Sequence, residues 1–333
     1  MFFLNGWNRW WIEIFRPLKF PMHLDIPSAY ERVRKYVRKT PVVSTRIGTA
    51  EVLLKLENLQ YTGSFKVRGA FNKIIKHKSR VKGVIAASAG NHAQAVARAA
   101  RALGIDRVKI VVPKNAPEIK KRNIRLLGAD LIVEGSHLNE SLRIANEIAL
   151  SERMTFVHPY DDLEIIEGQG TLGVELMDYE FDYLLIPVGG GGLSSGVCTA
   201  LRQSTTHASV RVIGVVARSA PSFFYSFKQG KMVAVEPKET IADGIRVKSP
   251  SELTFSILSR CMDDVVMVDE ASIRTAIAWS YYHLGQVVEG AGAVGIAALL
   301  QGKVTTNRKV MVVVTGGNID ERTLDAILDG SPI

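Results

Sequence analysis

Short apolar runs that alternate with helix-like segments constrain the fold of this chain more than any other feature. Between residues 84 and 151 each apolar run is too short for a helix, and a longer segment with helical spacing follows it. The runs are Val84–Ala87, Val108–Val112 and Asp130–Val133, and the helix-like segments are Asn91–Leu103, Ala116–Leu127 and Leu138–Ser151. This repetition predicts a mostly parallel sheet that is covered by helices on both faces.

The same alternation returns in the second half of the chain and predicts a second sheet. Its apolar runs are Tyr183–Val188, Arg211–Val216 and Lys309–Thr315. Gly104 and Gly128 end two of the earlier helix-like segments, as C-cap glycines do. Ligands of parallel sheets bind at the carboxyl ends of the strands. We therefore expect an α/β fold with two parallel-rich, doubly wound sheet domains and a ligand in the cleft between them.

Four consecutive glycines precede a segment that can open a helix at Leu193. They are Gly189, Gly190, Gly191 and Gly192. Residues without side chains let the backbone close around an anion, and the helix adds the positive end of its dipole. The spacing fits neither a dinucleotide fingerprint nor a P-loop. A tight turn is the alternative, but one glycine suffices for a turn, so we favour binding of a cofactor phosphate.

A lysine follows the strand-like segment Glu51–Leu56. Lys66 lies beside Phe65, where a helical pattern begins. A lysine near a helix start is usually a solvated charge. An amine that is partly shielded from water has a lowered pKa instead, and it can attack an aldehyde to form a Schiff base.

Six motifs together resemble the fold-type II pyridoxal 5′-phosphate enzymes, which share the tryptophan synthase β-like fold, and within them the threonine/serine dehydratases. The motifs are Ser64–Gly69, Ser88–Gln94, Gly189–Gly192, Glu239–Gly244, Val288–Gly292 and Thr315–Asn318. The resemblance runs from about Ile26 to Ile327. It implies pyridoxal 5′-phosphate as cofactor and a lyase that converts L-threonine to 2-oxobutyrate and ammonia, and L-serine to pyruvate and ammonia. It also implies a place in amino-acid metabolism such as isoleucine biosynthesis.

The resemblance assigns site residues by their matching positions. Lys66 is the catalytic residue that holds the cofactor covalently. The cofactor-binding residues are Phe65, Lys66, Asn91, Gly189, Gly190, Gly191, Gly192, Leu193, Glu289 and Thr315. The substrate-binding residues are Ser88, Ala89, Gly90, Asn91, His92 and Gly244.

Three of these assignments depend on the resemblance for their role. The residue matching Asn91 bonds the cofactor's ring hydroxyl, although a helix cap is a common role for asparagine. Thr315 matches the residue that faces the pyridine nitrogen, where many dehydratases have serine. A hydroxyl there leaves the nitrogen largely unprotonated, which favours elimination over racemisation. For Glu289, an exposed glutamate at a helix start is an equal alternative on the residues alone.

Two departures from related proteins separate this chain from serine racemases. Racemases place a serine acid/base where this chain has Ala89, and a methyl group cannot move a proton. Some relatives bind a divalent cation through carboxylates after the strand that matches Arg211–Val216. Ala217 and Phe223 supply no oxygen ligand there. We therefore predict little racemisation and no metal.

The resemblance implies a small domain, 60–155, inserted into a large domain built from 22–59 and 156–333. The first 21 residues form an aromatic-rich extension whose role stays open between an interfacial helix and an annotation artefact. Feedback-regulated relatives carry a regulatory extension after the segment that matches Thr315–Asn318. We expect none in this chain.

The composition indicates which kinds of molecule and which compartment suit this protein. The net charge is +9, but the basic residues are scattered without interleaved aromatics, so we expect no nucleic acid as partner. The only cysteines, Cys198 and Cys261, lie far apart in the sequence, which favours a reducing compartment. No apolar run reaches the roughly 18 residues of a membrane span. We expect a cytoplasmic homo-oligomer that binds a small amino acid. The alternatives are serine racemisation, β-replacement, threonine synthesis and a non-catalytic amino-acid binder.

Overall fold

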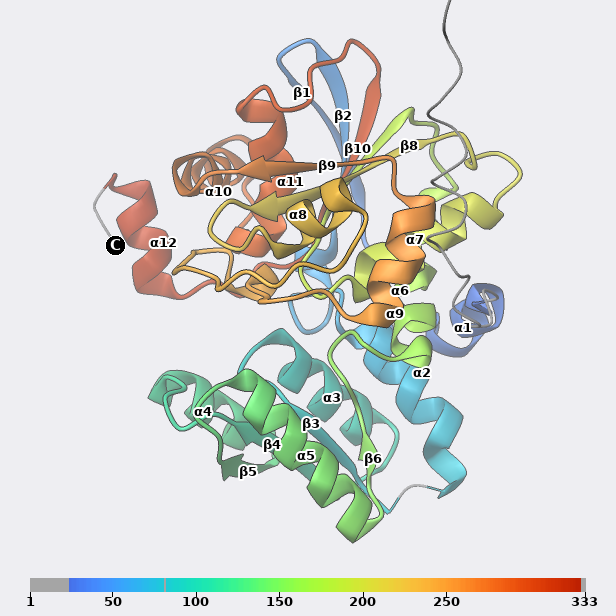
Figure 1. The fold of residues 1–333 in the computed structure, drawn as a ribbon, viewed down its shortest axis with the longest axis vertical. Coiled ribbons are helices and arrows are strands. Elements are labelled where there is room, and N and C mark those ends of the chain that lie inside the picture. The colour runs from blue at the N-terminus through green and yellow to red at the C-terminus, as the bar shows by residue number, and fades with distance from the viewer. Residues whose placement is uncertain (1–23, 81, 331–333) are drawn as a thin grey trace, which may run out of the picture.

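The computed structural model describes residues 24–80 and 82–330, so the aromatic-rich extension 1–21 lies outside the described residues. The larger of two sheets has the strand order β1-β2-β10-β7-β8-β9 (Figure 1). Its strands are β1 (Val42–Ile47), β2 (Ala50–Leu56), β7 (Tyr183–Pro187), β8 (Arg211–Ala217), β9 (Asp264–Val268) and β10 (Lys309–Val314). All neighbours run parallel except β1, which pairs antiparallel with β2.

The smaller sheet occupies the lower half of Figure 1 and is parallel throughout, with the order β5-β4-β3-β6. Its strands are β3 (Val84–Ala87), β4 (Val108–Val112), β5 (Asp130–Val133) and β6 (Thr155–Phe156). Val84 and Ala86 pack in the core that includes α3. Ile85 and Ala87 pack against α5. The strand is therefore apolar at every position because both of its faces are buried.

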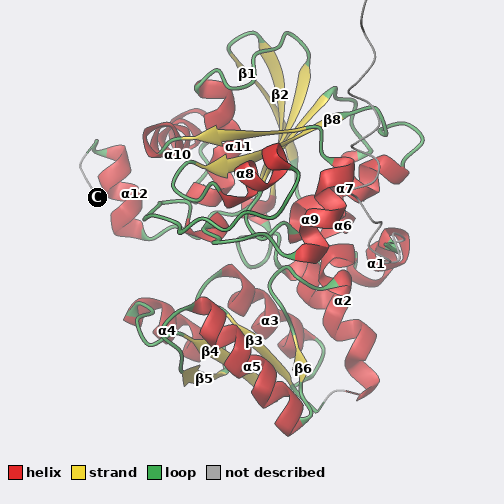
Figure 2. Ribbon diagram, viewed as in Figure 1, coloured by secondary structure: helices red, strands yellow, loops and turns green. Residues whose placement is uncertain are grey.

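Helices cover both sheets (Figure 2). They are α1 (Ile26–Val33), α2 (Val67–His77), α3 (Asn91–Ala102), α4 (Glu118–Leu126), α5 (Leu138–Glu152), α6 (Leu163–Leu176), α7 (Gly192–Gln203), α8 (Ser222–Gln229), α9 (Glu252–Cys261), α10 (Glu270–Leu284), α11 (Gly290–Leu300) and α12 (Glu321–Leu328). Three short 3₁₀ turns complete the described elements: η1 (Glu57–Leu59), η2 (Lys78–Arg80) and η3 (Asp243–Ile245).

The predicted fold class is confirmed: two parallel-rich sheets are each covered on both faces. In the large sheet, Leu185 and Val312 pack in the core that includes α11. Their neighbours Leu184 and Met311 pack in the core that includes α7 and α9. The division into a small domain, 60–155, and a large domain remains a prediction.

Close backbone approaches join α2, α6 and α7 into one layer. A Cβ on Gly168 of α6 would lie 2.6 Å from the Cα of Gly69 on α2. A Cβ on Gly170 would lie 2.9 Å from the carbonyl oxygen of Gly196 on α7. Larger residues at these contacts would push the helices apart. Because α2 begins beside Lys66 and α7 begins at the glycine run, α6 fixes the two candidate ligand-binding segments relative to each other.

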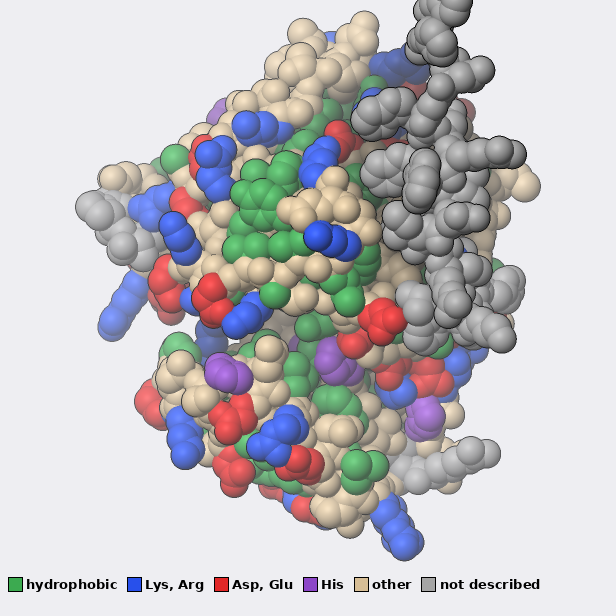
Figure 3. Space-filling model, in the orientation of Figure 1, with side chains coloured by type: hydrophobic (Ala, Val, Ile, Leu, Met, Phe, Trp, Pro, Cys, Tyr) green, Lys and Arg blue, Asp and Glu red, His purple; other side chains and the backbone are tan. Residues whose placement is uncertain are grey.

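Charged side chains are dispersed over one face of the molecule. On the face drawn in Figure 3, Lys and Arg side chains are spread over both halves of the molecule and lie among Asp and Glu. Over residues 24–80 and 82–330, no helix combines the length and the apolar content that crossing a membrane requires.

Candidate active site

Lys66 is the N-cap residue of α2 and is only partly exposed. Its Nζ donates a hydrogen bond to the carbonyl oxygen of Pro159 at 2.8 Å and lies 5.1 Å from the centroid of the Phe65 ring. Burial lowers the pKa of Lys66 to about 8, although the carboxylate of Glu289 opposes the shift. This amine therefore loses its proton far more readily than a surface lysine does.

The backbone of the Lys66 loop pairs with the loop that follows β10. Phe65 N donates to the carbonyl oxygen of Thr315 at 3.1 Å, and Gly317 N donates to the carbonyl oxygen of Gly63 at 2.9 Å. Ser64 and Gly316 form an antiparallel bridge between them. The structure thereby places Thr315, which is buried, beside the lysine loop, as the two motifs require if they share a ligand.

Glu289, Asn91 and Asn318 form a polar cluster next to this pairing. Asn91 Nδ2 donates to both carboxylate oxygens of Glu289, at 2.8 and 3.1 Å, and Asn318 Nδ2 donates to Asn91 Oδ1 at 2.7 Å. Burial raises the pKa of Glu289 to about 7, even though the Asn91 amide stabilises the carboxylate. A Cβ on Gly316 would collide with this carboxylate. The side chain can therefore be protonated or ionised near neutral pH.

The helix-terminus alternatives for two of these residues are wrong. Glu289 does lie at a helix start, as the N-cap residue of α11, but it is buried rather than exposed and its side chain makes no capping bond. Gly90, not Asn91, is the N-cap of α3. The Asn91 side chain therefore faces the Glu289 carboxylate instead of capping the helix.

The glycine run shapes the start of α7. Gly191 is the N-cap residue with φ +86°, a left-handed conformation that favours glycine, and no described side chain caps this helix. A Cβ on Gly190 would overlap the ring of Tyr160, and one on Gly189 would lie 2.7 Å from the Cα of Ile245. Gly192 and Leu193 form the first turn. Its N–H groups have the helix dipole behind them and suit an anion.

The predicted substrate loop connects β3 to α3. Ser88 Oγ accepts a hydrogen bond from Gly90 N at 3.1 Å, and Ala89 is half-buried between them. A nitrogen of His92, Nε2, lies 2.7 Å from the carbonyl oxygen of Val157. A carbonyl only accepts, so Nε2 carries the hydrogen and the buried Nδ1 has no partner. Burial lowers the pKa of His92 to about 3, so the ring is neutral.

Gly244 lies in η3, where a Cβ would be 3.0 Å from the Cβ of Ala291 and 4.0 Å from Glu289 Oε1. The structure therefore brings the Glu239–Gly244 motif against the Val288–Gly292 motif. It also gathers the predicted residues around Lys66, Glu289 and the start of α7.

The segment from Val157 to Tyr160 also lies at the site, although no motif in the sequence predicts its role. Pro159 accepts the hydrogen bond from Lys66, and the Tyr160 ring lies against Gly190, so this segment connects the lysine to the glycine run. Burial also lowers the pKa of His158 to about 4. The one available signal was its position after a strand of the parallel sheet, but β6 has only two residues and no apolar run.

The residues fit a phosphorylated aldehyde. Lys66 supplies an amine with a lowered pKa, and the uncapped start of α7 supplies backbone donors for a phosphate. Ser64 Oγ and His92 Nδ1 are buried without hydrogen-bond partners, as polar atoms that await a ligand are.

The described residues contain no group of three His, Cys, Asp or Glu side chains that could hold a metal ion. The absence of a metal near Ala217–Phe223 remains a prediction, since no comparison tests it.

Comparison with known proteins agrees with this chemistry. A model of the family described as pyridoxal-phosphate dependent enzyme matches residues 33–316. L-threonine ammonia-lyase of Thermotoga maritima is 42% identical over 313 residues, which cover 92% of this chain and 77% of the relative. The crystal structure of T.th. threonine deaminase is 35% identical, with a TM-score of 0.83 over 89% of this chain and 98% of that one. The structure of maize serine racemase is 33% identical, with a TM-score of 0.83 over 92% of this chain and 96% of that one. The chain belongs to the family of pyridoxal-phosphate dependent enzymes.

Proposed function

We propose that this protein dehydrates and deaminates L-threonine to 2-oxobutyrate and ammonia, and L-serine to pyruvate and ammonia. The observation that carries the proposal is the position of Lys66. Its amine donates a hydrogen bond to the carbonyl oxygen of Pro159, and the next residue, Tyr160, lies against the glycine run at the start of α7. The names of the threonine ammonia-lyase and threonine deaminase relatives support the same reaction.

Residues from separate segments would hold the cofactor at both of its ends. Lys66 would bind the aldehyde carbon, and Gly189–Gly192 with Leu193 would bind the phosphate. Phe65, Asn91 and Thr315 would contact the ring. When bound, pyridoxal phosphate supplies an electron sink for the bonding electrons released at the substrate Cα.

Lys66 moves the proton at the substrate Cα. The free Lys66 amine would accept this proton, because its lowered pKa keeps the amine deprotonated at mildly alkaline pH. The β-hydroxyl would leave as water, with the proton that it needs supplied at the phosphate end of the site. Thr315 presents a hydroxyl, not a carboxylate, to the ring nitrogen, which favours this elimination.

The loop before α3 binds the substrate carboxylate. Ser88, Ala89, Gly90, Asn91 and His92 lie where backbone N–H groups and the N-terminal end of the helix converge, and both favour an anion. The neutral His92 shapes this loop and transfers no proton. The carbonyl of Gly244 would contact the substrate, and the buried Glu289 would lie near the cofactor ring.

One assay tests the proposal. Purified protein reconstituted with pyridoxal phosphate should show the visible absorbance of the lysine-bound cofactor and release 2-oxobutyrate from L-threonine. Thiol-dependent product formation would identify β-replacement, and product formation from a phosphorylated hydroxyamino acid would identify threonine synthesis. Absorbance without any turnover would identify a non-catalytic binder.

The pKa of Lys66 predicts how cofactor capture depends on pH. Only the neutral amine attacks an aldehyde. The rate at which the cofactor-free protein captures pyridoxal phosphate should therefore rise with pH and then level off, with the midpoint of the rise at about pH 8. Below that pH it should fall about tenfold per unit. Stopped-flow absorbance measures the rate. A midpoint near 10.5, the value of an ordinary lysine, would contradict the burial of this amine.

Ala89 predicts the balance between elimination and racemisation. L-Serine should give pyruvate with little D-serine, because Ala89 leaves the face opposite Lys66 without a proton donor. Adding or chelating magnesium should change the rate only slightly. Ala89→Ser should raise D-serine formation by about a hundredfold, the lower end of a general-acid effect. Chiral chromatography measures it, and Ala89→Gly is the control for loop shape. Abundant D-serine from the unaltered enzyme would show that another residue serves this face.

We further propose a cytoplasmic homo-oligomer with no nucleic-acid partner and a place in isoleucine biosynthesis. The small amino-acid substrate follows from the proposed reaction, and the dispersed charge on the face drawn in Figure 3 supports the absence of a nucleic-acid partner.

A further inference from the structure

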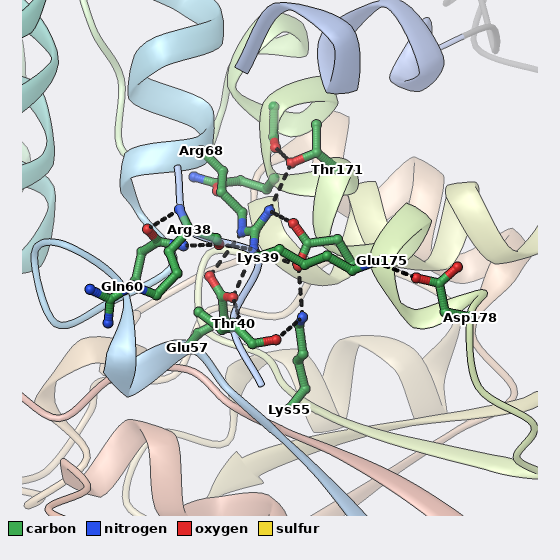
Figure 4. Close-up of polar contacts among 12 residues, drawn as sticks. Arg38, Lys39, Thr40, Lys55, Glu57, Gln60, Arg68, Thr171, Glu175 and Asp178 are labelled. Atoms are coloured by element: carbon green, nitrogen blue, oxygen red, sulfur yellow. Dashed lines mark hydrogen bonds and ion pairs between the residues drawn. The ribbon is translucent and has the colours of Figure 1, made fainter. Parts of the chain in front are cut away.

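Arg68, two residues after Lys66 in the sequence, belongs to a buried network of four charged side chains. Arg68, in the first turn of α2, donates from Nε and Nη2 to the two carboxylate oxygens of Glu57, each at 2.8 Å. From its other edge it donates to both oxygens of Glu175, at 2.7 and 3.0 Å. Figure 4 shows the guanidinium between the two carboxylates. Arg68 and Glu57 are fully buried, and Glu175 is 2% exposed.

The fourth member is Lys55 on β2. Its Nζ donates to Glu175 Oε2 and to the carbonyl oxygen of Thr40, both at 2.7 Å, and Thr40 Oγ1 donates to Glu57 Oε1 at 2.5 Å. Two cations face two anions, so the network is balanced in charge. Burial alone would lower the pKa of Arg68, but Glu57 and Glu175 outweigh it and raise that pKa. The guanidinium is therefore permanently charged.

The network ties three elements to the start of α2. Glu57 belongs to η1, directly after β2, and Glu175 lies in the last turn of α6. Backbone hydrogen bonds connect Arg68 and its helix to the Lys66 segment. Arg68 N donates to Phe65 O at 3.1 Å, and Ala70 N donates to Lys66 O at 3.2 Å. A rigid guanidinium that holds two carboxylates bidentately fixes direction as well as distance.

Stability alone does not explain such a group. Replacing a buried ion cluster by apolar residues is often neutral or stabilising, so a cluster of this kind is weak evidence for a stabilising role. Its position offers another role. The only network member on the lysine-bearing helix is Arg68, whereas Lys55 contacts the same Glu175 from the sheet.

We propose that Arg68 is a positioning residue for the reaction, which orients the first turn of α2 through Glu57 and Glu175 and thereby aims the Lys66 amine at the substrate Cα. The proposal rests on the proposed function for the identity of the reaction, but not for the position of the amine. Lys66 acts at a reacting atom, and a displacement of about 1 Å at such a group can cost about a hundredfold in rate.

The test compares Arg68→Met with Lys55→Met in the full-length protein. Each variant removes one buried positive charge from the same network, so each should lower the melting temperature by roughly 10 °C. Only Arg68→Met should lower kcat for L-threonine, by about a hundredfold, with KM changed less than about threefold. It should also shift the pH midpoint of cofactor capture, which Lys55→Met should leave near 8.

Two more variants keep the test decisive if Arg68→Met does not fold. Arg68→Met with Glu57→Gln restores the balance of charge, so it should regain stability and still show the low kcat. Arg68→Lys keeps one charge without the bidentate geometry and should lie between the wild type and Arg68→Met in kcat.

Equal loss of kcat in Lys55→Met and Arg68→Met, or full kcat in the charge-balanced variant, would overturn the proposal. Failure of the wild type to release 2-oxobutyrate would refute the proposed function instead, and the capture midpoint would still decide the position of Lys66.

Discussion

Lys66→Ala should abolish the visible absorbance of the lysine-bound cofactor and reduce 2-oxo acid formation by at least about 10⁴-fold. Two effects add in this variant, since the amine that binds the aldehyde and the base that accepts the Cα proton are the same group. Loss of a general base alone costs about 10²–10⁴-fold. The structure adds that the alanine would also leave the Pro159 carbonyl without the hydrogen bond from Nζ.

Lys66→Arg is the matched control for charge. A guanidinium stays protonated, cannot bind an aldehyde and cannot accept the Cα proton, so this variant should be as inactive as Lys66→Ala. Absorbance spectra and 2-oxo acid assays check both variants, and circular dichroism checks that they fold. Retention of full activity in either variant would refute the covalent role of Lys66, and with it the reaction class.

The sequence predicted the buried strands well because burial on both faces leaves a continuous apolar run. The structure reproduces the predicted bounds of β3, β4 and β5. Gly104 and Gly128 have φ of +69° and +79°, as their predicted role at helix ends requires. Apolar runs and C-cap glycines are local features, so they can be recognised without knowledge of the tertiary structure.

Edge and connecting elements were harder to predict. The edge strand β1 reads Val-Val-Ser-Thr-Arg-Ile, and most of its residues are partly exposed or exposed around its polar centre, so it has no apolar run. The central helix α6 is buried around most of its circumference, which removes the one-sided apolar pattern of a surface helix. By contrast, β9 carries the apolar run Val265–Val268, a pattern typical of a strand.

The candidate site divides in the same way. Lys66 and the glycine run lie in motifs whose chemistry can be read locally. Tyr160 and Arg68 gain their meaning only from contacts with residues distant in the sequence. Lys55 shows why: a lysine on a strand is expected to be solvated, and its partner Glu175 lies 120 residues away. Long-range ion pairs of this kind leave no periodic signal.

Gly190→Leu should weaken binding of pyridoxal phosphate by at least about a hundredfold, as expected when about 3 kcal/mol of phosphate contacts are lost. Gly190 is the better position for this test than Gly191. At Gly191 the φ of +86° would strain any side chain, so a loss of binding there would not distinguish the phosphate from the backbone. Equilibrium titration of the cofactor-free protein measures the affinity, and thermal unfolding measures the stability.

A side chain on Gly190 would overlap the Tyr160 ring, and it would also occupy the place of a bound phosphate. The two effects have to be separated. The control is therefore Gly190→Leu in a Tyr160→Ala background, compared with Tyr160→Ala alone. If Gly190 serves the phosphate, the double variant should recover stability, since the colliding ring is gone, but not cofactor affinity. If Gly190 serves only the turn and the packing of Tyr160, both should recover together. Unchanged cofactor affinity in Gly190→Leu itself would show that the glycine run is a turn and that the phosphate binds elsewhere.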